Sequence, residues 1–207
     1  AAVIAIDWLT GKRINEILRL KRQDITITKN EIQIKFTVGK KRARTSPIEL
    51  QPYQKTKTIK HKAVPTILEY LNEYDTRLAN DPDIAQYIKD TGGYLFPCPN
   101  EPRTITVTTT FTNGKGEKEK RTYTYQHPGG YMRKENAYYY LQKINQQLPP
   151  ERRIYFHYGR HNIGLKMAYQ GKSPYQIAAV LDETVLAALE YTKHASAYDS
   201  EWRKEEE

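Results

Sequence analysis

The sequence predicts a mainly helical domain with a small antiparallel β-sheet, an α+β fold that carries a further β-hairpin. Apolar residues recur at helical spacing near both ends of the chain. Residues 24–38 alternate apolar and polar side chains, and residues 104–125 place two threonine-rich stretches around a glycine-containing turn. At 207 residues the chain is long enough for one well-packed domain.

The first third of the chain is expected to hold two helices and the small sheet. Residues 1–9 are typical of the end of a helix, a Thr-Gly break follows, and residues 12–20 resume helical spacing. The alternating segment 24–38 predicts a hairpin. Residues 39–50 then predict a basic turn and a short third strand that ends near residue 50.

In the middle of the chain, helical spacing returns over residues 64–89 and is interrupted by the sequence NDPD. A loop over residues 92–102 leads into the threonine-rich hairpin. Residues 131–148 predict another helix, which bears three consecutive tyrosines.

Two further helices are expected near the end of the chain. The first continues from Arg160 to about Tyr169, and Gly171 fits its C-terminal stop. Ser173 fits the N-cap of the second helix and Pro174 its first position. That helix leads into the sequence DETVLAALEYTKHA.

Positive charge is concentrated near the start of the sequence. The whole chain has 33 Lys and Arg against 24 Asp and Glu, a net charge of +9. Residues 11–62 contain fifteen of the basic residues and only four acids. This basic block suits the phosphate backbone of a nucleic acid, and an ordinary solvated surface is the alternative interpretation.

The single cysteine, Cys98, excludes an internal disulfide framework and a cluster of thiolate metal ligands. It favours a reducing compartment, so we expect a cytoplasmic protein. No apolar run has the length of a membrane span, and no signal-peptide pattern opens the sequence, so we expect no membrane partner.

Common catalytic chemistries have little support in the sequence. His157 and His161 lie four residues apart, but no third ligand marks a metal site. Gly39-Lys40 lacks the other glycines of a phosphate-binding P-loop, and no G-x-S-x-G motif is present. We therefore expect neither a metal nor a cofactor.

Four motifs occur in a fixed order along the chain, and together they suggest a phosphodiester site. They are TGKRINEI with Arg13 and Glu16, the turn Gly39-Lys40-Lys41, the pair His157-x-x-Arg160, and Tyr191 in ALEYTKHA. The set resembles the catalytic domain of the tyrosine recombinase (phage-integrase) family. That family's motifs read T-G-x-R-x-x-E-[LI], a strand-turn Lys, H-x-x-R, L-G-[HW] and a Tyr followed closely by Thr. The resemblance extends from Thr10 to His194.

The resemblance implies a catalytic role for five residues, and physical chemistry explains each residue type. The hydroxyl of Tyr191 would conserve the energy of a cleaved DNA strand as a phosphotyrosine ester. Arg13 and Arg160 would stabilise negative charge on the non-bridging oxygens with planar, permanently charged donors. His157 would bind the same oxygens or assist proton transfer from Tyr191. Lys40 would protonate the leaving 5′-oxygen.

Several assignments keep an alternative. Glu16 would orient Arg13 or His157, and Lys41 rivals Lys40 because the turn is about one residue shorter than is usual in the family. Tyr198 is the alternative to Tyr191. DNA-binding roles are expected for four basic residues of the same block, namely Lys12, Lys41, Arg42 and Arg44.

The sequence departs from the family pattern at two places. Residues of about 97–130 form a loop and an inserted hairpin, and contact with DNA, with another protomer or with neither remains open for residues 104–126. Glu183 stands where the family has His or Trp, and an ionised carboxylate there would repel a phosphate. Glu183 could pair with a basic side chain, turn away from the phosphate, or be protonated once DNA excludes water. We expect one of the first two arrangements, because two nearby guanidiniums favour the ionised form.

By the resemblance, residues 1–207 form the catalytic domain, and the N-terminal core-binding domain is not in this chain. The family implies a site-specific recombinase or integrase that acts on double-stranded DNA through a 3′-phosphotyrosyl link, as a homo-tetramer and through a Holliday junction. The Lys-, Glu-, Ile- and Tyr-rich composition suggests an archaeal virus or plasmid integrase that integrates a viral genome. The alternatives are a type IB topoisomerase, a telomere resolvase, and a non-catalytic DNA-binding module of the same fold.

Overall fold

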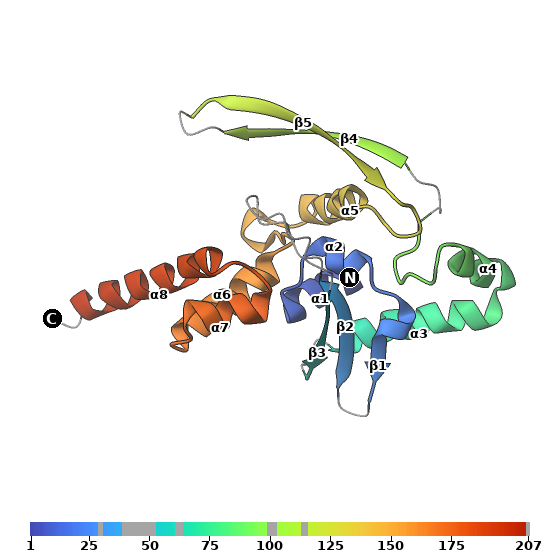
Figure 1. Cartoon of the computed structure of the whole chain (residues 1–207), viewed down its shortest axis with the longest axis horizontal. Coiled ribbons are helices and arrows are strands. Elements are labelled where there is room, and N and C mark those ends of the chain that lie inside the picture. The colour runs from blue at the N-terminus through green and yellow to red at the C-terminus, as the bar shows by residue number, and fades with distance from the viewer. Residues whose placement is uncertain (29–30, 39–52, 61–63, 99–102, 113–115, 206–207) are drawn as a thin grey trace.

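The structure is a computed structural model of the chain. It describes residues 1–28, 31–38, 53–60, 64–98, 103–112 and 116–205. Helices form the body of the molecule, with a three-stranded sheet on one side and a two-stranded hairpin on the opposite side (Figure 1). In order the elements are α1 (Ala2–Thr10), α2 (Ile14–Leu18), η1 (Arg22–Asp24), β1 (Ile25–Ile27), β2 (Ile32–Val38), β3 (Tyr53–Ile59), α3 (Val64–Asn80), α4 (Pro82–Asp90), β4 (Arg103–Thr112), β5 (Lys118–His127), α5 (Lys134–Gln146), η2 (Pro150–Arg152), α6 (Tyr158–Tyr169), α7 (Pro174–Leu181) and α8 (Val185–Glu205). The α+β class predicted from the sequence is confirmed.

The three-stranded sheet is antiparallel in the order β1-β2-β3. Alternate residues of β2 are apolar and buried, which gives the period of two expected for a half-buried strand. These residues are Ile32, Ile34, Phe36 and Val38. The hairpin predicted over residues 24–38 is therefore confirmed.

The third strand differs from the prediction. The short strand expected to end near residue 50 falls in residues 39–52, outside the described residues. The strand that pairs with β2 is Tyr53–Ile59, with Tyr53 opposite Val38 and Ile59 opposite Ile32. Lysines and threonines fill most of this strand, so it lacks the apolar run that would have marked it in the sequence.

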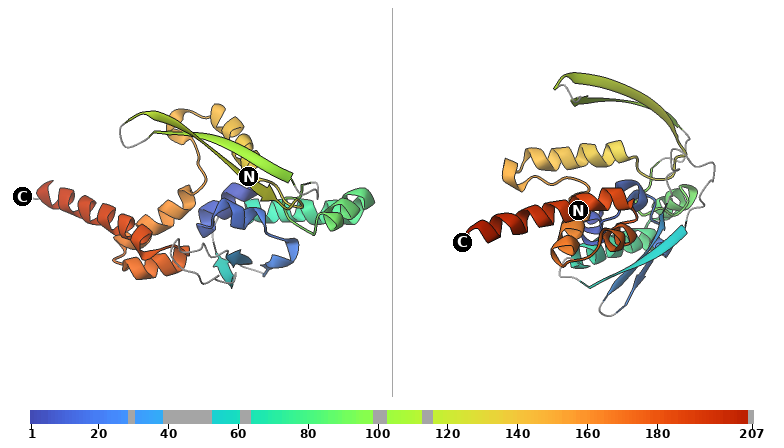
Figure 2. Two further views of the ribbon diagram at one scale, coloured as in Figure 1. Left: turned by 45° about the horizontal axis from the view of Figure 1, so that its top comes forward. Right: turned by 60° about the vertical axis from the view of Figure 1, so that its left-hand side comes forward.

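The apolar core has two parts. The larger part joins the first two helices, β2, α3 and the loop that precedes the long hairpin, and includes Ile17, Ile34 and Leu95. The smaller part lies among α6, α7 and α8 and includes Ile177 and Tyr191. Figure 2 shows α8 extending away from the body. No helix in the described part of the chain has the length and hydrophobicity of a transmembrane segment.

The helix ends near the C-terminus follow the sequence signals. The hydroxyl of Ser173 accepts a hydrogen bond from the Gln176 N–H at 3.3 Å, and Pro174 occupies the first turn of α7. Gly171 follows α6 with φ of 71°, a conformation that glycine adopts without strain. These predictions are confirmed, and they fix the short connection between α6 and α7.

The predicted long hairpin is also confirmed. Strands β4 and β5 pair over ten residue pairs, from Arg103 opposite His127 to Thr112 opposite Lys118. Threonines on one face hydrogen-bond across the strands. The hairpin lies over α5 in every view (Figures 1 and 2). The Tyr125 hydroxyl donates to Glu135 of that helix at 2.8 Å.

Candidate functional site

Arg13 lies at the N-cap of α2, directly after a tight turn at Gly11. Gly11 ends α1 in the left-handed region, with φ of 62°. The Arg13 guanidinium donates from Nη1 to Glu16 Oε1 at 3.3 Å and from Nη2 to the backbone oxygen of Asp182 at 3.0 Å. The Arg13 N–H also donates to Glu16 Oε2 at 3.2 Å. Glu16 therefore holds Arg13, as the sequence suggested.

Arg160 reaches the same place from α6. Its buried guanidinium donates from Nη1 to the Gly11 oxygen at 3.0 Å and from Nη2 to Glu183 Oε2 at 2.9 Å. Arg13 donates to Asp182 and Arg160 to Glu183, the next residue in the chain. Arg160 also donates to Gly11, two residues before Arg13. The fold brings Arg13 and Arg160, named here the arginine pair, to one place although they lie far apart in the chain.

Close backbone contact between α1 and the start of α6 makes this convergence possible. A Cβ atom on Gly159 would lie 2.4 Å from both the Asp7 oxygen and the Trp8 Cα. A Cβ on Gly11 would lie 3.2 Å from the Arg160 Cα. Larger residues at these glycines would separate the two segments and move the arginines apart.

His157 immediately precedes α6 and has a φ of 76°, an uncommon conformation for a residue with a side chain. Its N–H donates to Asp7 Oδ1 at 3.4 Å, and its buried Nδ1 has no hydrogen-bond partner among the described residues. Burial lowers the pKa of His157, and the charge of Arg160 lowers it further. The imidazole is therefore neutral near pH 7. Because His157 precedes the first residue of α6, it does not share a helix face with His161.

Asp7 supports this segment from α1, and the sequence analysis missed it. Burial raises the pKa of Asp7 to about 6, although hydrogen bonds from the N–H groups of His157 and Gly159 and the charge of Arg160 lower it. A lone acid in the apolar stretch AAVIAIDWL was the available signal. Asp7 orients the turn that carries His157 and Arg160.

Tyr191 lies on α8 with its side chain buried against α6. Its ring fills the space over Gly164, where an added Cβ would lie 2.7 Å from the ring. Its hydroxyl lies 3.3 Å from His161 Nδ1. Burial raises the pKa of Tyr191, Glu183 raises it further, and Arg160 lowers it. His161 is thus the hydrogen-bond partner of Tyr191.

The contact between His161 and Tyr191 was not predicted. The sequence offered His161 only as a metal ligand with His157. Among the described residues, no group of three or more His, Cys, Asp and Glu side chains is arranged to hold a metal ion. A histidine directly after the arginine of H-x-x-R was the signal that pointed to a partner for the tyrosine.

Asp182 ends α7 with φ of 54°, and three side chains donate to its carboxylate. Lys12 forms a buried ion pair with Oδ2, Lys55 Nζ lies 2.8 Å from Oδ1, and the Tyr53 hydroxyl lies 2.6 Å from Oδ1. Burial opposes ionisation, but these hydrogen bonds lower the pKa of Asp182 to about 2. We call these four residues the Asp182 cluster.

The Asp182 cluster corrects one expectation. Lys12 was expected to bind DNA, but its side chain is 1% exposed and is used in the ion pair with Asp182. A lysine with no access to solvent cannot neutralise a phosphate. The reason is local, because Lys12 follows the turn at Gly11 and points inward where Arg13 points to the site.

The carboxylate of Glu183 is only half satisfied. One carboxylate oxygen pairs with Arg160, and the other, Oε1, is buried without a hydrogen-bond partner among the described residues. Pairing with a basic side chain was one of the arrangements expected for Glu183. Other expected site residues lie outside the described residues, namely Lys40, Lys41, Arg42, Arg44 and the side chain of Tyr198.

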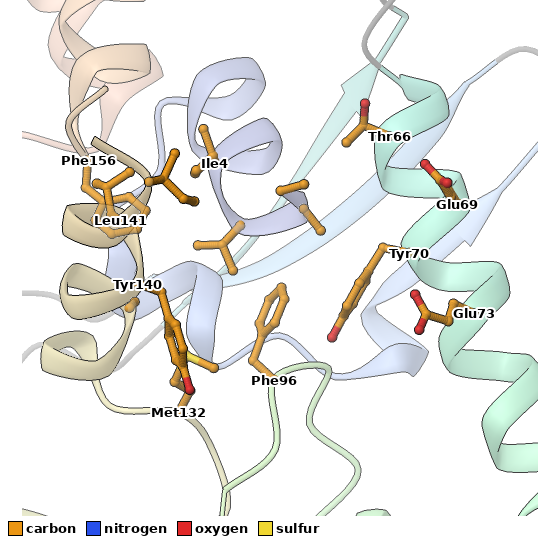
Figure 3. Close-up of a pocket in the computed structure, with 15 residues that line it drawn as sticks. Ile4, Thr66, Glu69, Tyr70, Glu73, Phe96, Met132, Tyr140, Leu141 and Phe156 are labelled. Carbon is orange, nitrogen blue, oxygen red and sulfur yellow. The ribbon is translucent and has the colours of Figure 1, made fainter. Parts of the chain in front are cut away.

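An apolar cavity of about 430 Å³ lies elsewhere, among α1, α3 and α5 (Figure 3). Phe96, Met132 and Leu141 line it, and the arginine pair and Tyr191 do not. Its polar lining residues include Glu69, Glu73 and Tyr70, and no arginine, lysine or histidine that could bind a phosphate is among its described lining residues.

The geometry of the site suits a phosphodiester. The arginine pair offers planar donors, and His157 is a neutral imidazole whose Nδ1 has no partner in the described part of the chain. Tyr191 presents a hydroxyl beside another imidazole. Such donors stabilise negative charge that develops on phosphate oxygens. A protein nucleophile then allows covalent catalysis.

Known structures with a similar fold are complexes of a site-specific recombinase. The chain is similar to the XerH site-specific recombinase in its post-cleavage complex with palindromic difH substrate, with a TM-score of 0.55 and 17% identity over 97% of this chain. It is also similar to XerH in a pre-cleavage complex with difH, with a TM-score of 0.50 and 18% identity over 92% of this chain. The chain spans 44% and 41% of the lengths of those proteins. The sequence matches no family model and no curated protein. The fold is that of a tyrosine recombinase catalytic domain.

Proposed function

We propose that this chain is the catalytic domain of a site-specific tyrosine recombinase that cleaves and rejoins DNA strands. The observation that carries the proposal is the convergence of Arg13 and Arg160 on adjoining backbone segments. His157 lines the same cleft as Arg13, and the Tyr191 ring packs against Gly164, four residues after Arg160 on α6. Two guanidiniums, a neutral imidazole and a tyrosine in one region form a site for phosphoryl transfer to tyrosine.

In the proposed reaction, the Tyr191 oxygen attacks the scissile phosphorus while the bond to the 5′-oxygen breaks. His161 Nδ1 is the acceptor nearest to the phenolic proton, at 3.3 Å, and His157 is the alternative acceptor. Lys40 supplies the proton that the leaving 5′-oxygen needs. The product is a 3′-phosphotyrosyl link and a free 5′-hydroxyl, and attack by a 5′-hydroxyl reverses the step.

Glu183 holds Arg160 before DNA binds. Its carboxylate offers an oxygen to the guanidinium in the way that a phosphate oxygen would. We expect the scissile phosphate to displace this carboxylate. An ionised Glu183 that stayed beside the phosphate would repel it.

The proposal extends to the partners that the family implies. Double-stranded DNA is the substrate, and recombination or integration proceeds through a Holliday junction in a homo-tetramer. The two similar structures are complexes of a recombinase with its DNA substrate, which supports DNA as the partner. A non-catalytic DNA-binding module is the second candidate, because Glu183 already occupies Arg160.

A trapping experiment separates the two candidates. The protein is mixed at low salt with a pool of nicked duplexes of randomised sequence, so that a short cleaved fragment diffuses away and leaves the covalent adduct. We expect a detergent-stable adduct whose peptide mass maps to Tyr191, and no adduct with Tyr191→Phe. An adduct on Tyr198 would show that the nucleophile is misassigned. DNA binding without any adduct would support the non-catalytic module.

A further inference from the structure

A second cleft begins at the candidate catalytic site and runs between the long hairpin and α5. Its volume is about 530 Å³, and it is lined by residues of α2, β4, β5 and α5 together with His157. Arg13 and His157 of the candidate site line it, and so do Tyr123 of the hairpin and Tyr139 of α5. We name this space the tyrosine cleft. It is continuous with the site proposed to hold the scissile phosphate.

The size of the tyrosine cleft restricts what it can bind. Its volume falls in the range of roughly 300–1,000 Å³ that is typical of small-molecule pockets. A DNA duplex is far too wide for it, since the major groove alone is about 12 Å wide. One or two nucleotides of a single strand fit this volume.

Exposed aromatic rings form the walls of the tyrosine cleft. The exposed fractions of Tyr123, Tyr138 and Tyr139 are 38%, 43% and 53%. Tyr123 stacks on Tyr125 with 6.3 Å between ring centroids, and Tyr138 meets Phe156 edge-on at 5.0 Å. Tyr139 meets Tyr140 edge-on at 5.6 Å, and Lys143 Nζ lies over its ring, 4.7 Å from the centroid. Each of the three rings therefore has a neighbouring side chain in contact and remains open to solvent. Aromatic surfaces of this kind stack on nucleobases without regard to base identity.

Charged groups of the tyrosine cleft complement a nucleotide. Lys134 Nζ lies over the Tyr123 ring, 5.3 Å from its centroid, and donates to its hydroxyl at 3.2 Å, so a cation lies against the ring on which a base would stack. Glu135 uses Oε2 to accept from Tyr125, while its buried Oε1 has no hydrogen-bond partner among the described residues. Lys134 Nζ is 3.9 Å from Oε1, within ion-pair range but beyond hydrogen-bond length. A buried acceptor without a donor is costly unless a ligand supplies one.

We propose that the tyrosine cleft binds one or two unpaired nucleotides that adjoin the phosphate held by the arginine pair. A base stacks on Tyr123 or Tyr139, and the exocyclic amino group of cytosine or adenine donates to Glu135 Oε1. This assignment rests on the proposed function for the position of the phosphate. It gives the inserted hairpin the role of holding DNA bases that have left the duplex beside the cleavage point.

Binding of fluorescein-labelled 12-mers at pH 7.5 and fixed low salt tests the proposal. One 12-mer is oligo-dC, and the other carries the same number of phosphates on abasic sugars. We expect the wild-type protein to bind oligo-dC at least about fivefold more tightly. The preference should vanish in Tyr123→Ala/Tyr139→Ala and persist in Tyr123→Phe/Tyr139→Phe. Tyr87→Ala, which removes a similarly exposed ring on α4, is the matched control and should keep the preference.

Equal affinity of the wild-type protein for the two oligomers would overturn the proposal, and so would a preference that survives in the double alanine variant. Glu135 has its own test, in which oligo-dC is compared with oligo-dT. We expect a preference of about threefold or more for oligo-dC that Glu135→Gln abolishes, because an amide both donates and accepts. Equal wild-type affinity for oligo-dC and oligo-dT would exclude the role of Glu135.

The outcome is separable from that of the covalent trapping experiment. Base-dependent binding without a covalent adduct would leave the tyrosine cleft in place and reject strand cleavage. A Tyr191 adduct together with equal binding of the abasic oligomer would reject the tyrosine cleft and leave strand cleavage in place.

Discussion

Two adjacent carboxylates, Asp182 and Glu183, follow the last residue of α7 and differ in how fully they are hydrogen-bonded. The side chains of both residues are buried, and each forms an ion pair with a basic residue. Asp182 accepts from three donors, and both of its oxygens are bonded. Glu183 accepts only from Arg160, and one of its oxygens has no hydrogen-bond partner among the described residues.

The difference separates an anchor from an exchangeable contact. Taking the Asp182 carboxylate away would leave buried lysine charge without a counter-ion, which is costly. Taking Glu183 away from Arg160 breaks a buried ion pair that has one hydrogen bond, and an incoming phosphate can replace both the charge and the hydrogen bond. The Asp182 cluster therefore holds the end of α7 in place, and Glu183 occupies the side that substrate is proposed to enter.

The largest expected effect comes from neutralising the two carboxylates in turn. Asp182→Asn should lower the free energy of unfolding by about 3–5 kcal/mol, because its amide nitrogen would face a lysine and Lys12 would stay buried without an opposite charge. The isosteric Glu183→Gln should cost only about 1–2 kcal/mol, since its carbonyl oxygen can still accept from Arg160. Urea unfolding at pH 7 measures both. Equal losses would remove the distinction between the two residues.

The second effect concerns catalysis. Arg160→Ala should slow formation of the covalent adduct by about 100–1,000-fold, the usual cost of removing one preorganised donor to a transition state. Glu183→Gln should retain cleavage, and Glu183→His should retain or raise it, because an imidazole restores a donor. Single-turnover trapping rates at saturating DNA give the comparison. A loss in Glu183→Gln as large as that in Arg160→Ala would make the carboxylate a working part of the site.

The sequence predicted the parts of the fold that follow local patterns. Alternating residues marked β2, and Ser173 with Pro174 marked the start of α7. The bounds of strand β3 were not predicted, because Lys55 and Lys57 of this strand donate to backbone oxygens at the end of α7. Their polar side chains are satisfied by tertiary contacts that have no local signature.

The candidate site shows the same division. The motif order named Arg13, Arg160 and Tyr191, because spacing along a chain survives in sequence. Asp7 and Asp182 were missed, since their roles depend on which segments meet in space. The DNA-binding role expected for Lys12 has the same explanation. Its position in a basic block predicts an exposed side chain, and only the fold shows that Lys12 pairs with the buried Asp182.

The third effect is a pair of opposite pH dependences. The pKa of Asp7 is raised from 3.8 to about 6, so Asp7 favours the folded state most below pH 3.8, and roughly 3 kcal/mol of that stability is lost as the pH rises through 6. The pKa of Asp182 is lowered from 3.8 to about 2, so it contributes roughly 2 kcal/mol above pH 3.8 that is lost as the pH falls through 2.

Urea unfolding between pH 3 and pH 8 tests the first of these slopes. Asp7→Asn keeps an acceptor for the N–H groups of the His157 turn and removes the ionisation. The stability of Asp7→Asn relative to wild type should therefore increase from pH 4 to pH 7. A difference that stays constant over this range would contradict the raised pKa of Asp7.

The smallest effect comes from Tyr53→Phe, which removes one donor from the Asp182 cluster and leaves both lysines. The Tyr53 ring is 37% exposed, so water can replace part of the lost hydrogen bond at 2.6 Å. We expect a loss of about 1 kcal/mol at pH 7 and no change in cleavage. Tyr175→Phe, on an exposed face of α7, is the control and should change stability very little. A loss in Tyr53→Phe as large as that in Asp182→Asn would show that the hydroxyl holds Asp182 in place and that the two lysines do not.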